Sequence, residues 1–233
     1  MAIILSIETA TNVCSTSITR NNDVVISKHD HLPNTHAKNL MLFIQKIIDE
    51  SNISLNDLDA VAVSEGPGSY TGLRIGFSSA KGLCYALDIP LISVSTLKGI
   101  AFSAKQQFVK TANTENYKLI PMIDAGRMEV YTAVYDQNLI TETEPHPLIL
   151  NENSFEDLND KTLIFAGNGS NKFSKIVNKS NYVFLNDINC NAESIGLLAQ
   201  EKYLLKQFTD IAYSEPFYLK QFEAKKSVVK GLH

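Results

Sequence analysis

The amino-acid sequence predicts an α/β fold made of two similar halves, each a mixed sheet covered by helices. Three observations lead to this prediction. Alternating, β-branched segments within the first 30 residues predict three strands, and their short connections make them antiparallel neighbours. Strands and helices then alternate, as they do where helical crossovers join parallel strands. The same pattern restarts near residue 118, which indicates an internal repeat.

In the first half, strands are expected at residues 2–7, 13–20, 24–29, 60–63 and 91–94, and helices at residues 35–50, 71–87 and 97–107. Asn21-Asn22 marks a tight turn between the second and third strands. Helix 35–50 carries apolar residues on more than one stripe, whereas a surface helix needs a single apolar face. We therefore expect it to pack on its own sheet and against something else.

A polar connector at residues 109–117 divides the chain into two subdomains, residues 1–108 and residues 118–233. The second subdomain is expected to have strands at 118–124 and 129–134, a third strand after the turn at 137–138, a segment at 147–150 and strands at 163–166 and 182–185, with helices near Phe155 and at 171–177 and 193–207. Ile7-Glu8 aligns with Ile123-Asp124 in this repeat. Two such halves are typical of tandem ribonuclease-H-like subdomains, the actin-like ATPase architecture, here with a reduced second half.

Composition excludes several classes of protein. Hydrophobic residues make up 44% of the chain and charged residues 20%, which is too apolar for a disordered protein. No apolar run approaches the ~20 residues of a membrane-spanning helix, and the first residues lack the features of a signal peptide. A net charge of −4 argues against a basic nucleic-acid-binding module. Cys14, Cys84 and Cys190 have no metal or redox spacing, so a cytoplasmic location is expected.

A glycine-rich segment, residues 65–76, follows the fourth strand and opens the second helix. It matches neither a P-loop nor the dinucleotide fingerprint, because the Lys-Ser/Thr pair is missing and the third glycine comes one residue late. Ser69 or Thr71 can cap the helix, and its free amides can hold an anion. Gly72, Gly76 and Ala80 recur every fourth residue, which lets another helix approach closely. That helix is either 35–50 of the same chain or one from a second molecule.

Five stretches, residues 7–11, 66–76, 94–97, 123–131 and 215–219, resemble the bacterial TsaB (YeaZ) family and span nearly the whole chain. The stretch GPGSYTGLRIG is highly specific in combination with the others. Two departures are Glu8, where many relatives carry Asp, and Gly126, which is inserted in the usual Ile-Asp-Ala-Arg stretch. The resemblance implies the actin-like fold and a role in threonylcarbamoyladenosine modification of the tRNA adenosine next to the anticodon.

The resemblance also implies partners: the transferase TsaD, which the chain would bind and activate, the ATPase TsaE, a second copy of itself, and tRNA indirectly through the complex. In the family, the helices that match 35–50 and 71–87 form a bundle with TsaD or with another TsaB. The interface residues expected on them are His36, Leu40, Phe43, Ile44, Ile47, Gly72, Arg74, Gly76, Ser79, Ala80 and Leu83.

Catalysis by this chain is not expected. TsaD resembles the first half but carries a His-x-x-x-His pair that binds a metal. Thr96 and Ile100 stand at the matching positions, and isoleucine cannot bind a metal. The chain is therefore expected to need no metal or cofactor of its own, and ATP or ADP at the boundary with TsaD stays open. The alternative is a stand-alone actin-like ATPase or a glycoprotease-type metallopeptidase.

A remnant of a nucleotide cleft is a further hypothesis. Glu8 and Asp124 end the first strand of each half, where the acids of actin-like ATPases face the cleft. Each can instead cap the turn that follows it. The candidate cleft residues are Glu8, Thr9, Gly68, Ser69, Asp124 and Arg127.

The remaining charged residues leave simple alternatives open. Arg74 opposes the helix dipole, so it needs an acceptor, either across an interface or within the chain at Glu65. Three histidines, His29, His31 and His36, are explained better by a solvated strand end than by a metal site. Lysines near the C-terminus either contact tRNA phosphates or keep the terminus soluble, and they are Lys220, Lys225, Lys226 and Lys230.

Overall fold

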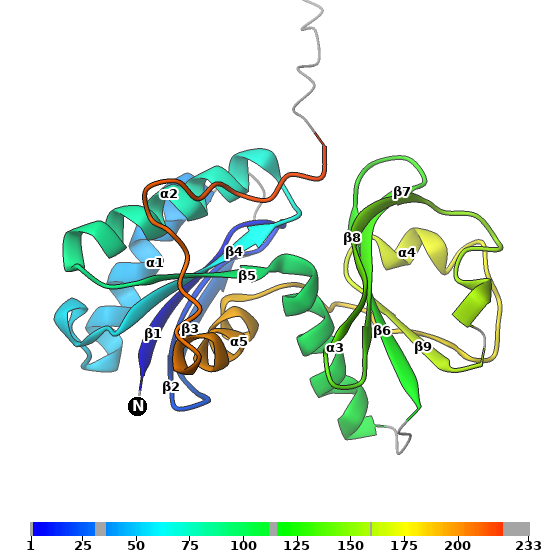
Figure 1. Cartoon of the computed structure of the whole chain (residues 1–233), viewed down its shortest axis with the longest axis horizontal. Helices are drawn as coiled ribbons and strands as arrows, with labels where there is room; N and C mark the ends of the chain where they lie inside the picture. The colour runs from blue at the N-terminus through cyan, green and yellow to red at the C-terminus, as the bar shows by residue number, and fades with distance from the viewer. Residues whose placement is uncertain (1, 31–35, 112–115, 159, 221–233) are drawn as a thin grey trace, which may run out of the picture.

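The computed structural model describes residues 2–30, 36–111, 116–158 and 160–220, and it contains two five-stranded mixed sheets (Figure 1). The strands of the first sheet are β1 (Ile3–Glu8), β2 (Cys14–Arg20), β3 (Asp23–Asp30), β4 (Ala60–Gly66) and β5 (Leu91–Ser95). They lie in the order β3-β2-β1-β4-β5, with β1, β2 and β3 antiparallel and β1, β4 and β5 parallel.

The second sheet repeats this topology. Its strands are β6 (Tyr117–Asp124), β7 (Glu129–Asp136), β8 (Thr141–Ile149), β9 (Thr162–Ala166) and β10 (Tyr182–Phe184). Their order, β10-β9-β6-β7-β8, is that of the first sheet listed from the opposite edge. The α/β fold class and the internal repeat are thus confirmed.

Helices α1 (His36–Ser51) and α2 (Tyr70–Leu87) cover one face of the first sheet. Buried side chains of both helices pack on odd-numbered residues of β1 and β4, such as Leu5, Ile7 and Val61. Even-numbered residues of the same strands point to the opposite face, because side chains alternate along a strand. That opposite face belongs to a second core, which lies between the two sheets and includes residues of both.

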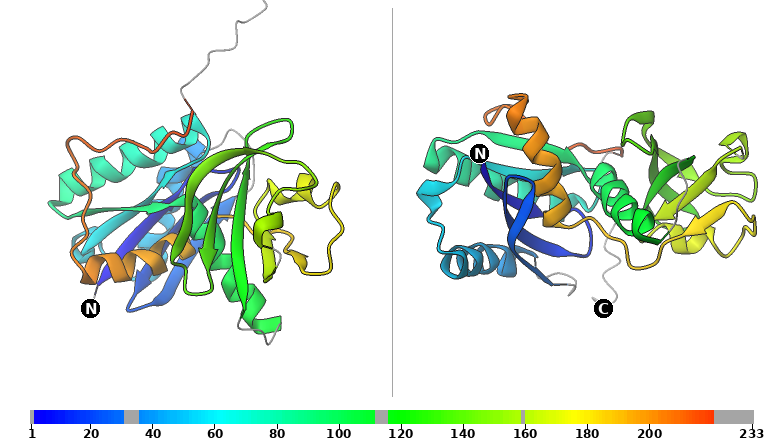
Figure 2. Two further views of the ribbon diagram at one scale, coloured as in Figure 1. Left: turned by 45° about the vertical axis from the view of Figure 1, so that its right-hand side comes forward. Right: turned by 90° about the horizontal axis from the view of Figure 1, so that it is seen from below.

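Helix α3 (Thr96–Thr111) lies between the sheets, and α5 (Ala192–Leu204) lies beside α3 on the first sheet (Figure 2). The outer face of the second sheet is covered by α4 (Ser170–Phe173) and by aromatic side chains that pack around Phe165. Two short 3-10 segments, η1 (Leu55–Asp57) and η2 (Glu156–Leu158), complete the elements, and η2 is the short helix expected near Phe155.

Helix α5 lies in the second half of the sequence, yet it packs against β1 and β2 of the first sheet. A Cβ atom at Gly196 would lie 2.7 Å from Ser6 Oγ and 2.6 Å from Thr19 Cγ2, so the helix axis lies close to those strands. Gln200 Nε2 adds a 3.2 Å hydrogen bond to the Ala2 carbonyl oxygen. Helical periodicity indicates that a segment is a helix but not which sheet it covers.

After α5, residues 205–220 form an irregular segment that we call the C-terminal strap. It pairs with the edge of β5, where Thr209 N donates to the Leu91 carbonyl oxygen at 2.8 Å. It then crosses α2, where Lys81 Nζ donates to the Ser214 carbonyl oxygen at 2.7 Å (Figure 1). At its end, Lys220 forms a 2.6 Å ion pair with Glu129 of β7. The strap therefore joins the first sheet, α2 and the second sheet. Lys225, Lys226 and Lys230 lie outside the described residues.

Candidate functional site

The glycine-rich segment is a tight turn packed against the end of β1. Ser69 is the N-cap of α2, and its Oγ accepts from Gly72 N at 3.2 Å, which selects Ser69 over Thr71 as the cap. Ser69 N donates to the Ala10 carbonyl oxygen at 2.7 Å. A Cβ atom at Gly68 would overlap that same oxygen, so the turn requires glycine there. The backbone of this segment is engaged in internal packing.

The stripe of small residues on α2 faces the inside of the protein. A Cβ atom at Gly72 would overlap the Thr9 carbonyl oxygen, and one at Gly76 would overlap Thr9 Oγ1. Thr9 Oγ1 donates to the Gly72 carbonyl oxygen at 2.7 Å, and Ala80 is fully buried. The small residues therefore do not form an open stripe for a second molecule: Thr9, at the end of β1, approaches Gly72 and Gly76, and Ala80 lies in the core.

On α1, three of the residues expected at an interface lie in the core. Leu40, Ile44 and Ile47 are at most 3% exposed and pack on the first sheet. The apolar side chains that point away from the sheet are Met41 and Leu42, each 53% exposed. Phe43 is half-buried against the core, and the side chain of His36 lies outside the described residues.

The exposed side of α2 is a ridge of residues at helical spacing, namely Thr71, Arg74, Ser78, Gly82 and Tyr85. Tyr85 is 85% exposed, and no atom lies within 4 Å of a Cβ position at Gly82. Ser79 and Leu83 are half-buried beside the ridge. Sequence reasoning missed Ser78, Gly82 and Tyr85 because it followed the inner stripe of small residues, although their spacing from Arg74 is also helical.

We call Met41, Leu42, Arg74, Ser78, Gly82 and Tyr85 the outer face of α1 and α2. Both helices bury their opposite sides in one core on the same face of the first sheet, so these residues all point away from that sheet.

Arg74 stands on an aromatic platform within this outer face. Its guanidinium carbon lies 4.2 Å from the ring centre of Tyr70, and the rings of Tyr70 and Tyr218 are 4.8 Å apart. Tyr218 raises the pKa of Arg74 most, with smaller contributions from Tyr70 and Glu215. Within the described residues no ion pair joins Arg74 to a carboxylate, so the expected internal alternative, Glu65, is not its partner.

Glu8, the acid at the end of β1, is enclosed by the protein. Its side chain is fully buried, and its Oε1 accepts from Ala10 N at 2.6 Å. Burial raises the pKa of Glu8 despite the opposing effects of Ser64 and Cys190. Thr9, beside it, is 1% exposed. These two candidate cleft residues therefore have no open surface.

Asp124, the corresponding acid of the second sheet, is held at the surface by a lysine. Lys172 Nζ donates to Asp124 Oδ1 at 2.7 Å and to the carbonyl oxygens of Arg127 and Glu129 at 2.9 Å each. Partial burial acts to raise the pKa of Asp124, but the hydrogen bonds from Lys172 and Gly126 N lower it overall. Arg127 is exposed with φ of 46°, and the inserted Gly126 has φ of 94°. This acid thus pins a turn, the alternative role that the sequence left open.

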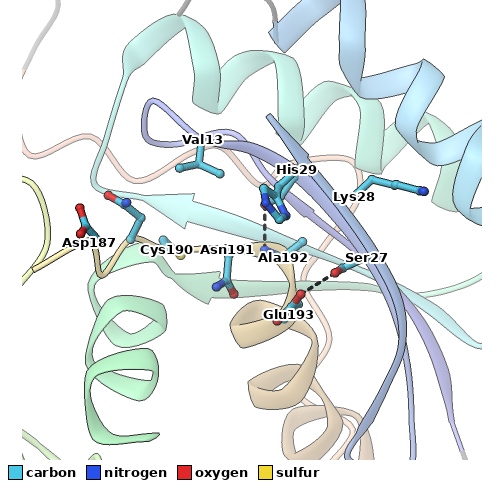
Figure 3. Close-up of a pocket in the computed structure, with 11 residues that line it drawn as sticks. Val13, Ser27, Lys28, His29, Asp187, Cys190, Asn191, Ala192 and Glu193 are labelled. Atoms are coloured by element: carbon cyan, nitrogen blue, oxygen red, sulfur yellow. Dashed lines mark hydrogen bonds between the residues drawn. The ribbon is translucent and has the colours of Figure 1, made fainter. Parts of the chain in front are cut away.

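A cavity of about 210 Å³ lies where β2 and β3 meet the start of α5 (Figure 3). Two pairs of its lining residues are hydrogen-bonded to each other. Ser15 Oγ accepts from Ala192 N at 2.9 Å, and Ser27 Oγ donates to Glu193 Oε1 at 2.5 Å. His29 also lines it, whereas His31 and the side chain of His36 lie outside the described residues.

Two negative findings apply to the part of the chain that the structure describes. It contains no group of three or more His, Cys, Asp or Glu side chains arranged to hold a metal ion. None of its helices has both the length and the apolar character needed to cross a membrane.

Comparison with known proteins gives one consistent result. The family model described as "TsaD: tRNA N6-adenosine threonylcarbamoyltransferase" matches residues 30–228. The chain is 37% identical over 150 residues to the "tRNA threonylcarbamoyladenosine biosynthesis protein TsaB" of Escherichia coli (strain K12), which covers 63% of this chain and 62% of that protein. It is 33% identical over 192 residues to the protein of the same description in Buchnera aphidicola subsp. Acyrthosiphon pisum (strain APS), with coverage of 78% and 83%.

The fold is also that of a solved structure. "YeaZ from Pseudomonas aeruginosa" is similar with a TM-score of 0.80 at 24% sequence identity, covering 94% of this chain and 100% of that chain.

Proposed function

Because the chain belongs to the TsaB (YeaZ) family, we propose that it takes part in threonylcarbamoyladenosine synthesis on tRNA as a non-catalytic subunit. In this proposal it binds the transferase TsaD and activates it toward the adenosine next to the anticodon. TsaE and the tRNA join through the complex, and the same surface permits a homodimer. The proposal places the chain in the cytoplasm, which is consistent with its three free, buried cysteines.

The observation that carries the binding role is the outer face of α1 and α2. Met41, Leu42 and Tyr85 leave large apolar surfaces in water on two adjacent helices. Burying one such side chain contributes roughly 1.5–3 kcal/mol. Ser78 and Gly82 are small, so a partner helix can approach α2 closely between Arg74 and Tyr85. This geometry suits a helical bundle with two helices from a partner.

Two features support a non-catalytic role: the surroundings of Glu8 and Asp124, and the residues that stand where TsaD has its histidine pair. Thr96 and Ile100 match the metal-binding histidines of TsaD, and they are 0% and 1% exposed. Glu8 is enclosed, and Asp124 is engaged by Lys172. We therefore propose no cofactor for the isolated chain, and we place any ATP or ADP at its boundary with TsaD.

Met41→Asp in the full chain tests the binding role, with TsaD affinity measured by calorimetry. We expect the Kd to rise tenfold or more, about 1.4 kcal/mol, because the new carboxylate must lose its water in the interface. Val109→Asp on α3 is the matched control, since Val109 is 57% exposed but lies on the other side of the first sheet, and its Kd should match wild type. Wild-type affinity for Met41→Asp would remove this face from the proposal.

A further inference from the structure

Helix α2 carries positive charge with no acid of its own. Arg74 and Lys81 are its charged residues, and the sequence from 70 to 87 contains no Asp or Glu. Arg74 lies near the N-terminal end, where the helix dipole is also positive. Lys81 Nζ is engaged by the Ser214 carbonyl oxygen at 2.7 Å. Among the described residues no ion pair joins Arg74 to a carboxylate, and Glu215 of the strap acts on it only at longer range.

The Arg74 side chain is held in place before any partner arrives. It stacks on Tyr70, whose ring in turn packs against Tyr218 of the strap. The strap is fixed at that point, because Phe217 N donates to the Glu65 carbonyl oxygen at 2.7 Å. A stacked guanidinium is already ordered, so it loses little conformational freedom when it binds a carboxylate with two parallel hydrogen bonds.

The acids on α1 and at the end of α2 in a second copy are poorly suited to supply that carboxylate. On α1, Glu50 pairs with Lys28 at 2.8 Å and Asp49 accepts from Gln45 Nε2 at 2.8 Å. The acid next to α2 is Asp88, its C-cap. In a symmetric dimer whose two α2 helices run antiparallel, Arg74 of one copy can meet Asp88 of the other only if the two-fold axis passes residue 81, which is midway between them in the helix. That register brings the two Lys81 side chains together, and like charges at an interface oppose association.

We infer that Arg74, on its Tyr70–Tyr218 platform, selects the partner of the outer face by pairing with a carboxylate of a different, acidic protein surface in preference to a second copy of this chain. The inference rests on the proposed function, in which that partner is TsaD. Arg74 and its pairing with a carboxylate would make the outer face bind a different protein in preference to a second copy of the chain.

The test measures two affinities for each full-length variant: TsaD binding by calorimetry and self-association by sedimentation equilibrium. We expect Arg74→Gln to weaken TsaD binding tenfold or more while self-association changes less than threefold. Arg74→Lys should also weaken TsaD binding, because an ammonium cannot form the two parallel hydrogen bonds. Arg20→Gln, at an exposed arginine of β2, is the control and should change neither affinity.

Three results would overturn the inference. Arg74→Gln weakening self-association as much as TsaD binding would make a second copy the partner of Arg74, and Asp88→Asn would then show the same loss. Unchanged TsaD binding in Arg74→Gln, with a loss in Met41→Asp, would refute the role of Arg74 and leave the proposed function standing. No TsaD binding by the wild-type chain would refute both.

Discussion

Glu8 and Asp124 occupy corresponding places in the two sheets, yet their surroundings shift their pKa values in opposite directions. Burial raises the pKa of Glu8 above its ordinary value of 4.5. The native chain therefore keeps this proton at pH values where the unfolded chain has released it. The contribution of Glu8 to the free energy of unfolding is therefore complete below about pH 4.5, and it is lost as the pH rises through the pKa of Glu8 in the folded chain. The pKa of Asp124 is lowered, so its contribution is present above its ordinary 3.8 and is lost as the pH falls.

Glu8→Gln should remove the pH dependence that comes from Glu8, since the amide keeps the acceptor for Ala10 N and does not ionise in this range. We expect the free energy of unfolding of the variant, relative to wild type, to rise as the pH increases above 4.5. Urea denaturation at several pH values between 2 and 8 measures this difference.

Asp124→Asn is the control, because the pKa of Asp124 is shifted in the opposite direction to that of Glu8. Wild type should be more stable than this variant at pH 7, and the difference should shrink as the pH falls through the folded-state pKa of Asp124, below 3.8. A constant difference between Glu8→Gln and wild type across the whole range would show that Glu8 does not titrate with a raised pKa.

At the scale of elements, local patterns predicted most helices and strands, and long-range contacts account for what they missed. Alternation and helical spacing placed α2 to within one residue at its start. They could not show that Gly72 and Gly76 face Thr9, since the spacing of small residues is the same whether a helix or a strand end approaches. The sheet covered by α5 and the path of the strap depend on contacts between residues more than 100 positions apart, such as Thr209 with Ser93.

Gly76→Ala tests whether the inner stripe serves folding or partner binding. The added methyl group would overlap Thr9 Oγ1, so we expect a loss of about 1–3 kcal/mol in the free energy of unfolding. Gly82→Ala, on the same helix with nothing near its Cβ position, should instead stabilise the chain by up to about 1 kcal/mol. Urea denaturation compares the two variants. A Gly76→Ala variant of wild-type stability that fails to bind TsaD would return this stripe to the interface.

At the scale of the whole molecule, the two sheets share one topology but have different surroundings. The first sheet is covered by long helices on both faces, and the outer two present exposed apolar residues. The second sheet carries short helical segments and an aromatic core on its outer face. The strap joins α2 to β7 through Lys81 and Lys220. The repeat and the reduced second half could be predicted from the sequence, whereas the exposed ridge of α2 required the packing to be known.

A dropout assay tests whether this chain is an activating subunit of TsaD, as we propose. TsaD, TsaE, the adenylate-forming enzyme, tRNA, threonine, bicarbonate and ATP are combined with and without the chain, and the modified nucleoside is quantified by mass spectrometry. We predict that threonylcarbamoyladenosine forms only when the chain is present, and that Met41→Asp lowers the yield while Val109→Asp does not. Equal product with and without the chain would contradict the claim.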